Sequence, residues 1–306
     1  MEHRNFTVKS SDGKFDLGCT VIVPEGDIKA VVQFSHGMAE HRQRYFPFME
    51  YLAENGYVCV INDHRGHGES VGEKKLLGHF ADLTGRAIVD DTLAVMNYVK
   101  EEYPDLPYFL FSHSMGTLVA RCFIQDHDDE ISGLVLSGPP FNNPLAKLGL
   151  GMVKVIEKMK GSEHRSKLLQ NMSTGAFDKA FKGEGLNAWL NTSPEKVKEY
   201  NEDENCGYMF TADGYRNLFT LMADAFDKKK YRMKNKKLPI FFVAGAEDPV
   251  IGDEFKFSET SGFLKKLGYE KVGSFLFYSM RHEILNERNN HLVYEEVLNF
   301  LDNNLS

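Results

Sequence analysis

The 306-residue sequence predicts an α/β protein, built on a mostly parallel, doubly wound sheet with a helical cap inserted into it. Short apolar runs of strand length alternate with longer stretches of helical spacing, which is typical of a parallel sheet covered by helices on both faces. Roughly a hundred residues separate the predicted strand ends near Ser137 and Leu238, where a crossover usually needs a dozen or so. An insertion of this length predicts a cap.

The elements follow in order from the N-terminus. Residues 5–24 alternate like two antiparallel strands, with a turn around Ser11-Asp12-Gly13. Parallel strands are expected at 30–35, 57–62, 107–111, 132–137, 238–244 and 272–278, and amphipathic helices at 44–55, 86–102 and 291–304. We therefore expect the core in residues 1–140 and 237–306, and the helical cap in residues 141–236.

The predicted cap is rich in large apolar side chains at helical spacing. They are Met152, Val153, Val155, Ile156 and Met159, then Leu218, Phe219, Leu221, Met222 and Phe226. Most should bury against the sheet domain, and a minority should line an apolar pocket over the site. The same content makes transient contact of the cap with a membrane surface an expectation.

Composition and charge exclude several classes of protein. The formal net charge of −8 and the pI near 5.8 argue against a nucleic-acid partner. The N-terminus lacks a signal-like apolar stretch, and no apolar run is long enough to predict a transmembrane segment. The four cysteines are scattered without C-x-x-C spacing, which indicates free thiols and a cytoplasmic location.

Three residues at predicted strand ends carry the chemistry. Ser114 lies between a strand and a helix, Asp248 follows the strand at 238–244, and His282 follows the strand at 272–278. The chain order serine, acid, histidine is that of the α/β-hydrolase fold. A serine hydroxyl needs a neutral imidazole to take its proton and a carboxylate to orient that imidazole. We therefore expect Ser114 as nucleophile, His282 as base and Asp248 as its partner.

A second serine matches the nucleophile motif more closely. Gly68-Glu69-Ser70-Val71-Gly72 fits G-x-S-x-G in full, whereas the segment 112–116, Ser-His-Ser-Met-Gly, has Ser112 in place of the first glycine. Ser70 lies in a polar run with neither a strand before it nor an apolar helix after it. The strand-turn-helix context that the motif requires therefore favours Ser114.

The oxyanion of the intermediate needs two backbone donors. One is expected from Met115, next after the nucleophile, and the other from Met38, in the loop after the strand at 30–35. Gly37 is expected to let that loop turn tightly.

Several motifs together resemble the family of monoacylglycerol lipases and bacterial lysophospholipase-like hydrolases. They are the loop 35–45 (SHGMAEHRQRY), similar to HG-x-x-EH-x-x-RY, the segment 63–70 (DHRGHGES), and the elbow at 113–116 (HSMG). The resemblance implies a cofactor-free hydrolase of carboxylic esters, most of all monoacylglycerols or lysophospholipid-type single-chain esters. It also implies that Glu40 and Arg44 hold the alcohol part of the substrate, with His113 as a further substrate-binding candidate.

Other interpretations stay open beside this one. Glu40 and Arg44 lie four residues apart and could simply pair. Charged groups near a core are usually paired, so Asp63, Arg65 and His67 are expected to form a buried brace. Asp91 and Asp253 are the alternative acids.

No metal is expected, because no histidine spacing matches a metal motif, and the resemblance implies no other cofactor. The histidines concerned are His36, His41, His64 and His67. Since fold does not fix function, a short-chain carboxylesterase, a peptidase, an acyltransferase or a non-catalytic binding protein remain alternatives. Against a peptidase, residues 36–40 read His-Gly-Met-Ala-Glu rather than the H-G-G-P-G loop of proline peptidases.

Overall fold

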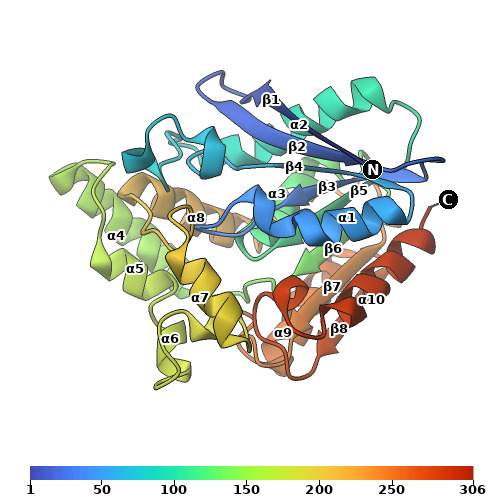
Figure 1. Ribbon diagram of the computed structural model, residues 1–306. Coiled ribbons are helices and arrows are strands. Elements are labelled where there is room, and N and C mark those ends of the chain that lie inside the picture. Colours follow the sequence, from blue (N-terminus) through green and yellow to red (C-terminus); the bar gives the residue numbers. More distant parts are fainter. Residues whose placement is uncertain (306) are drawn as a thin grey trace.

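The computed structural model describes residues 1–305 and contains one eight-stranded sheet (Figure 1). The strands are β1 (Glu2–Lys9), β2 (Asp16–Val23), β3 (Ala30–Ser35), β4 (Tyr57–Asn62), β5 (Tyr108–His113), β6 (Gly133–Ser137), β7 (Ile240–Gly245) and β8 (Val272–Phe277). Their order in the sheet is β1-β2-β4-β3-β5-β6-β7-β8. β1 and β2 form the expected antiparallel hairpin, β2 pairs antiparallel with β4, and all later pairs are parallel. The predicted mostly parallel sheet is confirmed.

The order of the strands indicates where in the sheet a functional site can form. From β3 the chain moves to β4 on one side, and later strands from β5 onward are added on the other side. The order therefore reverses between β3 and β5, and the carboxyl ends of these two strands open a crevice where ligands bind in such sheets. The loop after Ser35 and the turn at Ser114 both start at this crevice.

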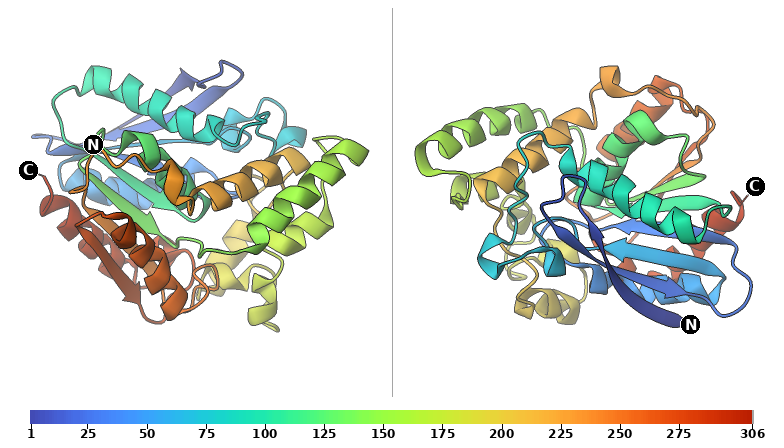
Figure 2. Two further views of the ribbon diagram at one scale, coloured as in Figure 1. Left: turned by 180° about the vertical axis from the view of Figure 1, so that it is seen from behind. Right: turned by 90° about the horizontal axis from the view of Figure 1, so that it is seen from above.

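Helices cover both faces of the sheet (Figure 2). α1 (Phe46–Glu54) and α10 (Asn290–Asp302) pack with one set of inward-facing strand residues, whereas α2 (Ala87–Glu102), α3 (Met115–His127) and α9 (Glu254–Leu267) pack with the other. β3, β4, β5 and β6 are buried along their whole length because they are covered on both sides. Such strands read in sequence as continuous apolar runs rather than alternating ones.

Between β6 and β7 the chain forms the insertion, all of whose α-helices fall within residues 141–236. They are α4 (Leu145–Lys160), α5 (Lys167–Ser173), α6 (Phe177–Ala180), α7 (Pro194–Glu202) and α8 (Ala212–Asp224). Ser193 and Thr211 begin α7 and α8, each accepting a hydrogen bond from a backbone N–H of the first turn. In Figure 1 the helices α4 to α7 lie on the side of the molecule away from both termini.

Short 3₁₀ turns complete the chain. They are η1 (Arg42–Tyr45), η2 (Gly68–Ser70), η3 (Lys74–Leu76), η4 (Ala188–Leu190), η5 (Lys228–Lys230) and η6 (Ile284–Asn286).

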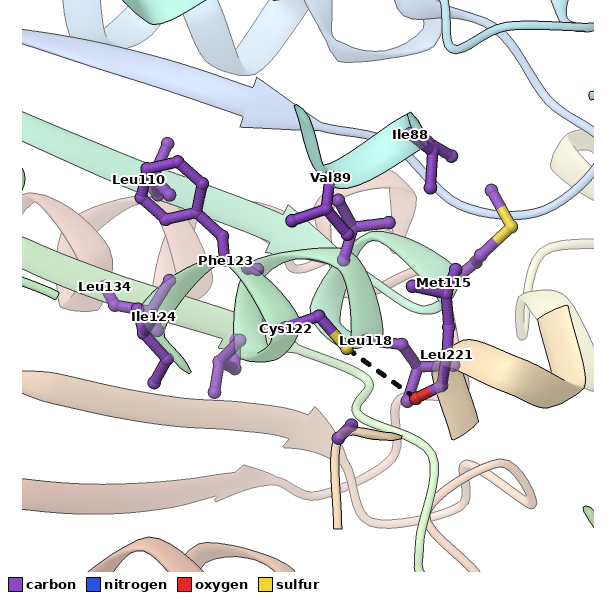
Figure 3. Packing of buried hydrophobic residues seen from close by; sticks show 14 of the residues in the cluster. Ile88, Val89, Leu110, Met115, Leu118, Cys122, Phe123, Ile124, Leu134 and Leu221 are labelled. Carbon is purple, nitrogen blue, oxygen red and sulfur yellow. Dashed lines mark hydrogen bonds between the residues drawn. The ribbon is translucent and has the colours of Figure 1, made fainter. Parts of the chain in front are cut away.

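The helix that follows Ser114 is held from several sides (Figure 3). Side chains of α3, including Leu118 and Phe123, pack with residues of α2, β5 and β6. The insertion joins this core through α8, where the Leu221 carbonyl accepts a weak hydrogen bond from the Cys122 thiol at 3.8 Å. Buried packing of this density leaves the start of α3 little freedom to move.

Candidate active site

Ser114 occupies a strained turn between β5 and α3. Its backbone has φ 52° and ψ −118°, a conformation that non-glycine residues rarely adopt. Two residues on, a side chain at Gly116 would collide with the carbonyl oxygen of Ser35. The elbow therefore needs glycine at 116, and it leaves Ser114 half-buried while its neighbours His113 and Met115 are buried.

Ser112 takes the place of the first motif glycine without entering the site. Its buried hydroxyl donates to the Val135 carbonyl on the neighbouring strand at 2.9 Å. The departure from the motif is thus accommodated by a satisfied hydrogen bond within the sheet.

Ser70 is a structural residue. Its hydroxyl donates to the Asp63 carbonyl at 2.6 Å and accepts from the Gly18 N–H at 2.9 Å, and the side chain is buried. These bonds tie η2 to β2. The hydroxyl that matches the motif best is therefore already engaged in holding a loop.

Asp248 and His282 meet at the carboxyl ends of β7 and β8. His282 Nδ1 donates to Asp248 Oδ2 at 2.8 Å, which leaves Nε2 for a serine hydroxyl. The second oxygen of Asp248 accepts from the Val250 N–H at 2.8 Å. Gly138, with φ 57°, lies against the pair, and a Cβ there would come within 2.9 Å of His282 Cε1.

The charge of Asp248 sets the titration of His282. Burial by itself lowers the pKa of His282, but the neighbouring Asp248 carboxylate raises it by Coulomb attraction and by its hydrogen bond. The net pKa lies above 6.5. The His282 ring therefore takes up its proton at a higher pH than a free imidazole does.

The loop after β3 lies against the elbow. A Cβ on Gly37 would lie 2.6 Å from Glu40 Oε1 and 3.2 Å from Ser114 Cβ, so a side chain here would force its neighbours to shift. The positive φ of 53° in the loop belongs to Ala39 instead, so the turn is made two residues later than the sequence suggests. Within residues 1–305 the N–H groups of Met38 and Met115 have no acceptor, as two oxyanion donors require.

Glu40 and Arg44 are bonded to protein groups. Glu40 accepts from the Gly37 N–H at 2.5 Å and from the Tyr45 hydroxyl at 2.7 Å, and it also binds Arg44 at 2.8 Å. Arg44 forms two further bonds with Glu283 at 2.5 and 2.7 Å. This geometry matches the alternative of an internal pair, and contact of either residue with substrate stays a prediction.

His113 lies beside both this ion cluster and His282. Its ring centroid is 4.6 Å from that of His282, and its Nδ1 lies 3.3 Å from Ser137 Oγ. Burial and the nearby His282 lower the pKa of His113 to about 3, so its ring is neutral. The cavity that it lines with Glu40, Arg44 and Glu283 measures about 10 Å³, room for about one water molecule.

The segment 63–70 braces the loops below the site. Arg65 binds Asp91 at 2.7 and 2.9 Å, and Asp63 accepts from the Arg42 N–H at 2.8 Å. His67 accepts from the Ala39 N–H at 3.4 Å. Asp91 is thus committed to Arg65, as expected of a buried charge.

Asp253 is equally committed to structure, because its carboxylate caps the start of α9 by accepting from the Lys256 N–H at 2.7 Å. Neither alternative acid is the partner of His282.

Sequence reasoning missed Trp189 and Glu287. The Trp189 ring, on η4 of the insertion, lies 5.2 Å from the His282 ring between centroids. Glu287 accepts at 2.9 Å from the N–H groups of both Arg281 and Thr192, so it joins the loop that carries His282 to the insertion. For Trp189 the sequence did offer one signal, because this residue is the one tryptophan of the chain.

One cluster has the donor types of a metal site. Ligand atoms of His41, Asp203 and Cys206 lie within 4.8 Å of one another. His41 Nε2 lies 2.8 Å from Asp203 Oδ2, so these two groups already pair with each other. Three donors are also one fewer than a closed zinc site uses, so this set fits a metal poorly.

Known proteins resemble the chain over most of its length. The family model described as serine aminopeptidase S33 (Hydrolase_4) matches residues 26–289. The chain is 27% identical over 241 residues to monoglyceride lipase of Rattus norvegicus, which covers 78% of this chain and 71% of that protein. It is 25% identical over 289 residues to monoacylglycerol lipase of Mycolicibacterium smegmatis, with 93% and 92% covered. A highly thermostable carboxyl esterase from Bacillus coagulans, solved in complex with glycerol, superposes with a TM-score of 0.93 at 25% identity and covers all of both chains.

Proposed function

Because this chain belongs to the serine aminopeptidase S33 family and is a carboxylic ester hydrolase, we propose that it cleaves monoacylglycerols or lysophospholipid-type single-chain esters through an acyl-enzyme on Ser114. The observation that carries the proposal is the Asp248–His282 hydrogen bond at 2.8 Å, beside a strained elbow that presents Ser114. The elbow lies near the pair, because the ring of His113, next to Ser114, is 4.6 Å from the His282 ring between centroids. A carboxylate, an imidazole and a hydroxyl gathered at one site are what acyl transfer needs.

In the proposed reaction, His282 Nε2 takes the Ser114 proton while Ser114 Oγ bonds to the ester carbonyl carbon. The carbonyl oxygen becomes an oxyanion held by the N–H groups of Met38 and Met115. His282 then returns the proton to the leaving alkoxy oxygen, the C–O bond breaks, and the alcohol departs. Water, deprotonated by His282, adds to the acyl-enzyme in the same way and releases the carboxylic acid and free Ser114.

The charges near the base favour an ester over a peptide with a free amino terminus. A peptide's α-ammonium group needs a carboxylate that is free to pair with it. Glu40 and Glu283, the acids beside the small cavity next to His113, both bind Arg44 instead. The alcohol part of an ester is neutral and needs no carboxylate to pair with it.

The relatives point to the same substrate class. The lipases of Rattus norvegicus and Mycolicibacterium smegmatis are named for monoacylglycerols, and the esterase of Bacillus coagulans was solved with glycerol. In this chain the insertion brings an aromatic wall, Trp189 and Phe177, to the proposed base. We infer that the insertion acts as a cap over a pocket for one acyl chain.

A series of monoacylglycerols and p-nitrophenyl esters tests this pocket. We expect kcat/KM to rise several-fold for each added pair of carbons, because each buried methylene contributes up to about 0.8 kcal/mol, until the chain outgrows the pocket. Triacylglycerols of the same chain length should react far more slowly. A flat profile or a preference for acetate would contradict a lipase and indicate a short-chain esterase.

The outer face of α4 supports a further proposal, contact with an anionic lipid surface. Its exposed apolar side chains are Leu145, Leu148, Val155 and Met159, the last of them 76% exposed. The lysines at 147, 154, 158 and 160 are exposed on the same helix, although the whole chain carries a net charge of −8. An apolar stripe flanked by lysines is typical of helices that lie at a membrane interface. Among residues 1–305, no helix has the length and apolar character of a bilayer span.

Flotation with phosphatidylglycerol vesicles tests this contact. We expect wild-type protein to float with these vesicles and the double variant Val155→Glu, Met159→Glu to lose most of its binding. Leu83→Glu is the matched control, because Leu83 is 84% exposed but lies outside the insertion. Equal binding of both variants, or equal binding to neutral phosphatidylcholine vesicles, would contradict the proposal.

We also infer a cytoplasmic location. All four cysteines are buried, free thiols within the described part of the chain. Unpaired thiols suit a reducing compartment.

A further inference from the structure

Trp189 meets the proposed base from the insertion. Its indole lies against the His282 ring at 5.2 Å between centroids, with 42° between the planes, and Phe177 packs on it at 5.0 Å. The Trp189 carbonyl accepts from the His282 N–H at 3.4 Å, and the next carbonyl, of Leu190, accepts from the Glu283 N–H at 2.8 Å. Two successive backbone bonds fix η4 against the loop of the base.

Side chains strengthen this attachment on both sides of the indole. Arg281 donates to the Ala188 carbonyl at 2.7 Å. Glu287 accepts from the N–H groups of Arg281 and Thr192, both at 2.9 Å. The indole is therefore held in one place relative to His282, as a substrate-contacting group must be.

The polar atom of this indole has no partner. Trp189 is 7% exposed, and among residues 1–305 nothing accepts a hydrogen bond from its Nε1–H. Buried polar groups are almost always paired, because an unpaired buried donor loses its bond to water without a replacement. An indole has a single donor and no acceptor, so its partner must be an acceptor that comes from outside the described residues.

The roles of the neighbouring groups indicate which substrate oxygen this is. The carbonyl oxygen of the ester is assigned to the N–H groups of Met38 and Met115, which leaves the alcohol part of the substrate for other donors. His282 must reach the leaving alkoxy oxygen to protonate it, so a ring packed on His282 lies beside the alcohol part. We propose that the Trp189 Nε1–H binds a hydroxyl of the substrate's alcohol part and so selects glycerol esters over simple alkyl esters. This inference rests on the proposed function.

The test compares two esters of one acid, monodecanoylglycerol and propyl decanoate, with wild type and Trp189→Phe. Phenylalanine keeps an aromatic ring against His282 but lacks the donor. We expect kcat/KM for the glycerol ester to fall about five- to tenfold, the worth of one neutral hydrogen bond, and the value for the propyl ester to change by less than about twofold. Phe177→Leu is the control, because it disturbs the packing of the indole without removing the N–H and should affect both esters alike.

Equal losses on both esters in Trp189→Phe would overturn the inference and leave a packing role for the ring. Equal wild-type turnover of both esters would also overturn it. If wild type cleaved the propyl ester but not the glycerol ester, the monoacylglycerol function would fail as well, so the two failures are distinguishable.

Fluorescence gives a second readout that does not depend on turnover. Trp189 is the one tryptophan of the chain, so emission excited at wavelengths that tyrosine does not absorb reports on it alone. With Ser114→Ala protein, we expect saturable changes in emission with 1-O-decylglycerol and smaller ones with decyl propyl ether. Identical responses to the two ethers would contradict a hydrogen bond to the glycerol hydroxyl.

Discussion

Ser114→Ala is expected to abolish ester hydrolysis, with kcat falling by on the order of 10⁵- to 10⁶-fold. The two other candidate serines are engaged elsewhere, because Ser112 is bonded to the neighbouring strand and Ser70 is buried in a loop. The measurement is turnover of p-nitrophenyl decanoate together with labelling by a fluorophosphonate probe, which reacts only with an activated serine. The variant should lose both signals and keep its melting temperature.

Ser70→Ala is the matched control, because Ser70 satisfies the nucleophile motif in full. Removing its hydroxyl leaves the Gly18 N–H without a partner, which should lower the free energy of unfolding by about 1–3 kcal/mol. Probe labelling and kcat of the folded protein should remain near wild type. An active Ser114→Ala protein beside a dead Ser70→Ala protein would show that the elbow has been placed wrongly.

The second large effect is expected for Asp248→Asn, with kcat reduced by about 10⁴-fold. Asparagine keeps the size of the side chain, but it cannot stabilise the imidazolium that forms in the transition state or hold Nδ1–H in the same tautomer. Asp253→Asn is the control, since Asp253 caps α9 and does not contact His282. Loss of activity in Asp253→Asn with Asp248→Asn fully active would contradict the assignment.

The pH profile reports on the same pair. The base works in its neutral form, and the Asp248 carboxylate holds the pKa of His282 above 6.5, so activity is lost as pH falls through that raised value. We therefore expect the acid limb of kcat/KM to have its midpoint above pH 6.5. In Asp248→Asn the remaining activity should show a midpoint at lower pH, because the carboxylate that raises the pKa is gone. An unchanged midpoint in that variant would mean that another group controls the profile.

Much of the fold could be predicted because its signals are local. β3, β4 and β5 are buried on both faces, so each appears as an unbroken apolar run bounded by polar turns. The hairpin of β1 and β2 was likewise visible in alternation. The interpretation of Ser114 rested on strand-turn-helix context, and the structure indeed places it directly between β5 and α3.

The apolar content of the insertion was visible, but its orientation was not. Val153 is buried and Val155 and Met159 are exposed, although all three carry the same hydrophobic signal. Spacing defines a helical face, yet only the neighbouring helix decides whether that face is covered.

The sequence by itself determined the class of fold, the order of the strands along the chain, and the residue types and order of the proposed triad. The tertiary structure decided which groups remain free to react. In the folded chain the Ser70 hydroxyl holds a loop, Glu40 binds the Gly37 N–H, and Arg44 binds Glu283. Folding also brings Trp189 to His282 from a distant segment of the chain. The physical reason is that turns and buried strands follow from neighbouring residues, whereas hydrogen-bond pairing and burial depend on groups that meet only when distant segments pack.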